Sequence, residues 1–129
     1  YRDGKGVKMS AKCTNLTGSW LDPYTAKALT KASEVDIDHM VPLAEAWRSG
    51  ASSWTTKHAT SFANDPLVLV SVQASANRSK GDKDPSAWMP ANKAAHCLYA
   101  KRWVAVKAKY KLTYASAEKK ALSKALGAC

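Results

Sequence analysis

The sequence has no apolar run that approaches the roughly 20 residues needed to span a bilayer, so a transmembrane helix is excluded. Acidic residues are scarce: ten Asp and Glu stand against twenty Lys and Arg, giving a formal charge of +10. This balance favours a polyanionic partner, although an acidic membrane or cell wall would attract such a chain as well. Repeats are also absent, and 129 residues suit one domain over 1–129.

Cysteine is rare, and its spacing excludes two common uses. Cys13, Cys97 and Cys129 lie far apart with no CxxC pair, which argues against a zinc ribbon or a thioredoxin-type site. Disulfides are therefore expected. Because the count is odd, Cys13 is either free or bonded to a segment that this sequence does not include. An initiator Met and a signal-peptide pattern are missing too, so we expect a processed product.

Short elements of both kinds are expected before residue 86. Residues 1–33 lack sustained periodicity and predict irregular structure or short strands. Alternating residues over 35–41 predict a half-buried strand that stops near Pro42, and the apolar run over 67–72 predicts the best strand of the chain. Three short helices are expected between capping or breaking residues: 42–50, 52–63 and 75–80, the last ending at Gly81.

The last third of the sequence predicts a helical hairpin. Apolar residues recur at helical spacing over 91–111 and again over 116–126. If these helices pair in antiparallel fashion, Cys97 and Cys129 meet at the open end, and we expect them to form a disulfide. Closing a loop of this length stabilises a small domain by about 2–4 kcal/mol. The fold class is therefore predicted to be α+β.

Two groups of polar residues are candidates for chemistry. Asp38 and His39 end the first of these strands beside Pro42, where an imidazole can act as a base and a carboxylate can bind a hard cation. Regular strand geometry points the two side chains to opposite faces, so a shared site requires a break in the pleat. Taken alone, the pair favours a surface ion pair or a structural histidine over a catalytic site.

The second group follows the strongest strand, on the short helix and the loop after it. The amide oxygen of Asn77 can complete a metal shell, and three cations can bind phosphate: Arg78, Lys80 and Lys83. A solvated basic turn is the plain alternative. His58 and His96 are interpreted as structural residues, and the five tryptophans are assigned to packing rather than to the substrate.

Together these segments resemble the HNH, or ββα-metal, nucleases, and within them the secreted fungal and actinobacterial proteins with a DUF1524-type domain. The resemblance covers nearly the whole chain, and it is carried by these blocks in order: 35–47 (VDIDHMVPLAEAW), 49–54 (SGASSW), 62–65 (FAND), 77–84 (NRSKGDKD) and the helix 97–110.

The resemblance implies a two-stranded hairpin and a following helix that clasp one divalent ion, here with additional helices and the C-terminal hairpin. It assigns His39 as the general base and Asp38 and Asn77 as ligands of the metal, for which we expect Mg²⁺, with Mn²⁺ as the alternative. It further implies a secreted, extracellular endonuclease that acts on DNA, with RNA as a second substrate. We expect a monomer.

Two positions depart from the family pattern. The middle Asn, which usually braces the loop that holds the His, aligns with Val68, so either Asn64 or backbone groups must replace it, or activity is reduced. Related chains also carry an upstream segment with a Cys and an Arg. We expect Cys13 to have lost its partner with that segment, and an active-site group can be missing with it.

Three functions remain open at this stage. The first is a metal-dependent endonuclease with little sequence preference, since phosphate contacts position a substrate without reading its bases. The second is a non-catalytic cationic protein that binds nucleic acid or acts as an antimicrobial, which Val68 favours. The third is a metal-independent ribonuclease that pairs His39 with His58 or His96.

Overall fold

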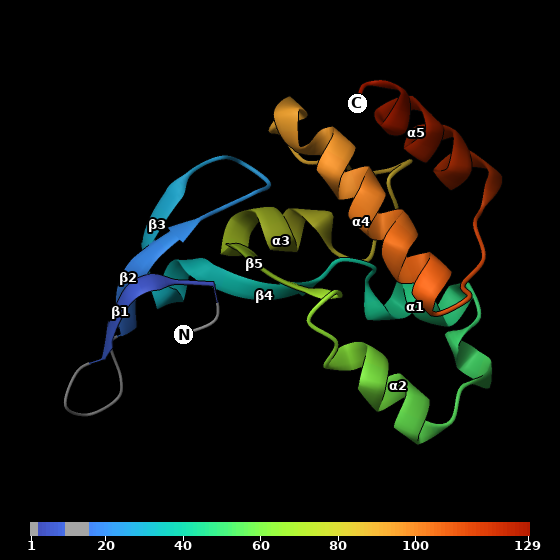
Figure 1. Ribbon diagram of the computed structural model, residues 1–129, viewed down its shortest axis with the longest axis horizontal. Coiled ribbons are helices and arrows are strands. Elements are labelled where there is room, and N and C mark those ends of the chain that lie inside the picture. The colour runs from blue at the N-terminus through green and yellow to red at the C-terminus, as the bar shows by residue number, and fades with distance from the viewer. Residues whose placement is uncertain (1–2, 10–15) are drawn as a thin grey trace.

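A computed structural model describes residues 3–9 and 16–129, and Figure 1 shows their arrangement. The described strands are β1 (Lys5–Met9), β2 (Leu16–Leu21), β3 (Ala28–Lys31), β4 (Val35–His39) and β5 (Leu69–Gln73). The α-helices are α1 (Leu43–Arg48), α2 (Thr56–Ala63), α3 (Ala74–Lys80), α4 (His96–Lys109) and α5 (Ser116–Gly127). The expected α+β fold is confirmed. Within these residues no helix is long and apolar enough to cross a bilayer.

The N-terminal third is more regular than its composition suggested. β1, β2 and β3 form an antiparallel sheet in that order, at one end of the molecule beside the β4–β5 pair (Figure 1). An irregularity in β1 falls at Gly6, whose φ of +59° suits a residue without a side chain. Trp20 and Leu29 pair across β2 and β3 and are buried, which anchors the sheet. Cys13, and with it the expectation about its partner, lies outside the described residues.

The unit formed by β4, β5 and α3 matches the strands and short helix expected from the sequence. β4 and β5 are antiparallel and in register from Val35↔Gln73 to His39↔Leu69. α3 follows β5 without a loop and ends at Gly81, whose φ of +54° stops the helix. The buried valines of β5 face the core, as their apolar run predicted.

Two helices begin later than their residue patterns indicated. α2 was expected from residue 52 but starts at Thr56, because the Thr55 side chain accepts a hydrogen bond from His58 N–H and caps the helix. Trp54 therefore lies ahead of the helix, although its ring still contacts His58 and Phe62. α4 was expected from residue 91 but starts at His96, after a 3₁₀ turn over 93–95.

A buried cation joins the C-terminal hairpin to α1. Lys107 on α4 is fully buried and pairs with Glu118 at 2.7 Å and Glu45 at 3.0 Å. Glu118 also accepts the indole N–H of Trp103 at 2.8 Å. Removing one partner of a buried ion pair costs about 3–5 kcal/mol because the other charge remains without compensation. This cluster fixes α1, α4 and α5 relative to one another.

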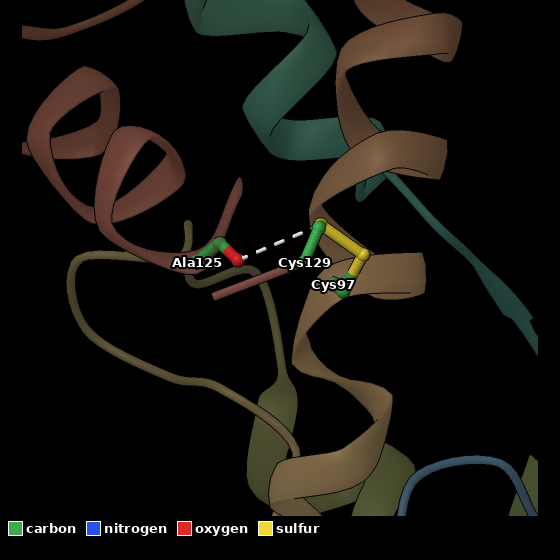
Figure 2. Close-up of a disulfide and its surroundings, with 3 residues drawn as sticks. All are labelled: Cys97, Ala125 and Cys129. Carbon is green, nitrogen blue, oxygen red and sulfur yellow. Dashed lines mark hydrogen bonds between the residues drawn. A yellow bond between two sulfur atoms is a disulfide. The ribbon is translucent and has the colours of Figure 1, made fainter. Parts of the chain in front are cut away.

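α4 and α5 form the antiparallel hairpin that the sequence predicted (Figure 1). Cys97 and Cys129 are joined by a disulfide with a Cα–Cα distance of 5.3 Å, and Figure 2 shows the bridge together with the contact from Cys129 Sγ to the Ala125 carbonyl. The bridge spans 32 residues of sequence. It therefore ties the end of α5 to the start of α4 and closes the hairpin.

Replacing both cysteines, Cys97→Ser with Cys129→Ser, is expected to lower the free energy of unfolding by about 2–4 kcal/mol, since the unfolded chain regains the freedom of the open loop. Urea unfolding under non-reducing conditions measures the difference. Adding a reductant should lower the stability of the wild type toward that of the variant and leave the variant unchanged. Equal free energies of unfolding of wild type and variant without reductant would contradict the prediction.

Candidate active site

A pocket of about 400 Å³ lies where β4 ends and α1 and α3 approach it. Its lining is Ile37, Asp38, His39, Pro42, Leu43, Ala44, Asn77, Arg78, Gly81 and Asp82. The base and the two metal ligands that the family resemblance implied thus share one pocket. β4 stays paired with β5 through His39, so the break in the pleat that we expected is absent. A shared pocket does not require that break, because Asp38 and His39 both line the pocket at the end of β4. Among the described strands, β4 pairs only with β5.

Asp38 uses only half of its carboxylate within the protein. Its Oδ2 atom accepts hydrogen bonds from Lys80 Nζ at 2.5 Å and from the Tyr24 hydroxyl at 2.6 Å. Its Oδ1 atom takes part in none of the hydrogen bonds among the described residues. The side chain is therefore held in one orientation with one oxygen left over. A carboxylate oxygen fixed in this way is a suitable ligand for a hard cation.

Lys80 corrects one of the sequence-based assignments. The sequence suggested that it binds phosphate, but the residue is fully buried, and its ammonium group donates to Asp38 and to the carbonyls of His39 (2.9 Å) and Met40 (2.8 Å). All three donors of the ammonium group are therefore occupied. Lys80 holds the end of β4 in place and does not face the substrate.

Burial shifts the titration of both partners of Asp38. It raises the pKa of Tyr24 well above its usual value, and the Asp38 carboxylate adds to that shift. It lowers the pKa of Lys80, while the attraction of Asp38 opposes the change. Tyr24 is consequently a neutral hydrogen-bond donor at physiological pH.

Asn77 is oriented by the second acidic residue of β4. Its Nδ2 atom donates to Asp36 Oδ2 at 2.9 Å, so the amide oxygen is the end of the side chain that is left for another partner. Arg78 Nε lies 3.7 Å from the same Asp36 oxygen, and the Arg78 side chain is 75% exposed at the pocket. Asp36 lies two residues before Asp38, but the sequence did not predict that it orients a metal ligand.

His39 is held by the backbone at the end of α2. Its Nε2 atom lies 3.0 Å from the Ala63 carbonyl oxygen. A carbonyl only accepts hydrogen bonds, so in the neutral form of the ring Nε2 carries the proton and Nδ1 has the free electron pair. The imidazole also lies nearly parallel to the Phe62 ring, at an angle of 9°. Its position is thereby fixed on two sides.

A backbone hydrogen bond joins the residue after His39 to the position that aligns with the missing Asn. Met40 N–H, immediately after His39, donates to the Val68 carbonyl at 2.7 Å. Asn64, the other candidate, donates its amide to the Thr60 carbonyl at the end of α2 and does not brace the loop. The structure thus contains a backbone bond of the kind that one of the two expected replacements requires.

The end of α2, which carries Ala63, is fixed to α4 by Asp65, a residue that the sequence singled out only within the block 62–65. Asp65 Oδ2 accepts from Lys109 Nζ at 2.5 Å and from the Tyr110 hydroxyl at 2.6 Å. The Lys109 bond, then the Tyr110 bond, lower the pKa of Asp65 from 3.8 to about 2. Arg102 adds hydrogen bonds to three carbonyls, those of Pro66, Leu67 and Leu69.

The remaining candidates lie at the rim of the pocket or away from it. Asp82 lines the pocket and is held by Arg48, whose guanidinium donates to its carboxylate at 3.1 Å. Lys83 is exposed and donates to the Ser79 carbonyl. His58 contacts the Trp54 ring, and His96 contacts the Pro90 carbonyl at 2.7 Å. Neither of these two histidines lines the pocket around His39.

A sequence model of the family described as "GmrSD restriction endonucleases, C-terminal domain" matches residues 7–125. The chain belongs to this family. The match confirms the resemblance to HNH-type nucleases and makes this a nuclease-related domain. No solved structure matches the chain.

A curated relative agrees with the extracellular expectation. It is described as an uncharacterized secreted protein of Arthroderma benhamiae and is 45% identical over 130 residues, which cover 99% of this chain. The chain spans 64% of the length of that relative. The expected location outside the cell is confirmed by this family member.

Asp65→Asn should lower the free energy of unfolding by about 2 kcal/mol at neutral pH, because the variant lacks the carboxylate whose pKa falls from 3.8 to about 2 on folding. A lowered pKa stabilises the folded state above the unfolded pKa. The difference between variant and wild type should therefore shrink as the pH falls from about 4 to 2. Urea unfolding across this range measures it, with Glu34→Gln as an exposed control. A difference that does not change with pH would contradict the assignment.

Proposed function

We propose that this protein is an endonuclease that hydrolyses phosphodiester bonds of DNA, and of RNA as a second substrate, with one divalent ion at the pocket between β4 and α3. One observation supports this most directly. An imidazole with its Nδ1 free shares a pocket with two residues that each have an oxygen left over, Asp38 and Asn77. These are the groups that hydrolysis of a phosphodiester requires.

His39 is the proposed general base. The Ala63 carbonyl keeps the proton on Nε2, so Nδ1 can accept a proton from a water molecule as that water attacks phosphorus. The new bond joins the water oxygen to phosphorus, and the bond from phosphorus to the leaving oxygen breaks. Solvent supplies the proton that this oxygen gains. Neither His58 nor His96 lies at the pocket to serve as a second histidine, so the metal-independent ribonuclease finds no support.

The donor set fits a hard divalent ion, which we propose to be Mg²⁺, with Mn²⁺ as the alternative. Asp38 offers one carboxylate oxygen and Asn77 one amide oxygen, the ligand types such ions prefer. Among residues 3–9 and 16–129 no three His, Cys, Asp or Glu side chains gather into a fuller metal cage. A site with two protein ligands suits an ion whose other ligands are water molecules and substrate phosphate oxygens. When bound, it would stabilise negative charge on the phosphoryl and leaving oxygens.

The cationic surface supplies the attraction for the polyanion. Arg78 is exposed at the pocket, and Lys83 follows it by five residues on the exposed loop after α3. Such contacts to phosphate position a substrate without reading its sequence, so we propose little sequence preference. The antimicrobial or merely cationic protein remains the competing function. Its main support was Val68, whereas the Met40–Val68 backbone bond supports a loop that is held without a side-chain amide.

His39→Ala should reduce cleavage of plasmid DNA in Mg²⁺ by a factor of about 10² to 10⁴ while leaving DNA binding intact, because the base is lost and the cationic surface is not. Gel assays of nicking and filter binding measure the two properties. His58→Ala serves as the matched control and should cleave like the wild type. EDTA should abolish wild-type cleavage. Binding without cleavage in Mg²⁺ and in Mn²⁺ would support the non-catalytic protein instead.

Asn77→Ala should raise the Mg²⁺ concentration for half-maximal cleavage by about tenfold or more, since one ligand oxygen is lost. Asp36→Asn should also raise this Mg²⁺ concentration, because the charged acceptor that orients the Asn77 amide is lost. Ser75→Ala, an exposed position on the same helix, is the control. An unchanged Mg²⁺ dependence in Asn77→Ala would remove this residue from the metal site.

A further inference from the structure

A second hollow lies directly beside the candidate active site, between α1 and α2. It has a volume of about 460 Å³, and no charged residue lines it. Two residues make it continuous with the active site. Leu43 lines both hollows, and Ala63, whose carbonyl orients His39, lines this one. The two hollows therefore lie next to each other, and one extended ligand can occupy both.

One wall of the groove carries a large aromatic ring that the fold does not use. Trp47 on α1 is 63% exposed, and Leu43, one helical turn before it, is 53% exposed. In the part of the chain that the structure describes, no other ring stacks on Trp47, whereas Trp54 at the same groove packs against Phe62 and Tyr110. Trp47 thus offers a free ring face at a site open to solvent.

We propose that this groove binds a nucleobase of the substrate strand next to the scissile phosphate, stacked on Trp47. This inference rests on the proposed function and adds a substrate class to it. The hollow has no cation for a phosphate, but an apolar wall with threonine hydroxyls suits the flat, neutral face of a base. The phosphate would lie in the neighbouring pocket with Arg78. The net charge of +10 makes a polyanionic strand the fitting occupant.

Binding of a base in this groove determines whether single-stranded or duplex nucleic acid is preferred. A base can enter the groove only after it leaves the stack of its neighbours, which costs less in a single strand than in a duplex. The groove therefore favours single-stranded or locally unpaired nucleic acid. Because every base has an aromatic face, such binding requires no particular sequence.

The test is the affinity for short labelled oligonucleotides, measured by fluorescence anisotropy in EDTA so that cleavage does not interfere. Trp47→Ala should raise the Kd for a single strand by about fivefold or more, and Trp47→Phe, which keeps a ring, by less than about twofold. Leu98→Ala, which removes an exposed apolar residue from α4, should change nothing. An oligonucleotide of abasic nucleotides should bind wild type and Trp47→Ala equally.

Several outcomes would overturn the inference. An equal loss of affinity for normal and abasic strands would show that Trp47 binds no base. Unchanged binding of normal strands by Trp47→Ala would do the same, while cleavage in Mg²⁺ would leave the nuclease proposal standing. Conversely, base-dependent binding without any cleavage would contradict the proposed nuclease activity but support base binding in the groove. Concentration-dependent self-association that Trp47→Ala abolishes would assign the groove to a second copy of the chain.

Discussion

The ion pair of Lys80 with Asp38 is the interaction on which the geometry of the pocket depends. A single buried ammonium group joins the last turn of α3 to the carboxylate and to two carbonyls at the end of β4. Without Lys80, the Asp38 charge would be buried and uncompensated, and the helix that carries Asn77 would lose its buried link to the strand that carries His39. Lys80 contacts only Oδ2 of Asp38, so Oδ1 is left for a metal ion. The Asp38 side chain thus both holds the fold together and offers a ligand.

Local signals in the sequence were sufficient for the elements that form the pocket. Alternation identified β4, a β-branched run identified β5 to within two residues, and Gly81 marked the end of α3. The hairpin spacing also placed the Cys97–Cys129 bridge. The family resemblance then brought together Asp38, His39 and Asn77, which line one pocket in the structure.

What the sequence did not predict depends on contacts between distant residues. The strands of the first sheet have little periodicity of their own, so only tertiary packing reveals them. Lys80 looked like an exposed cation because lysine is rarely buried, and its partner lies 42 positions earlier in the chain. The Asp65 contacts to Lys109 and Tyr110 were hidden for the same reason. Part of the positive charge thus has a structural role inside the fold.

The bond between Met40 N–H and the Val68 carbonyl does not depend on the side chain at position 68. An amide side chain that braces a catalytic loop can be lost through a single codon change, whereas every amino acid at position 68 brings a carbonyl oxygen with it. The side chain at position 68 is therefore constrained only by packing in the hydrophobic core, where valine is fully buried. The placement of the loop after His39 therefore follows from the pairing of β4 with β5 and not from the identity of the side chain at position 68.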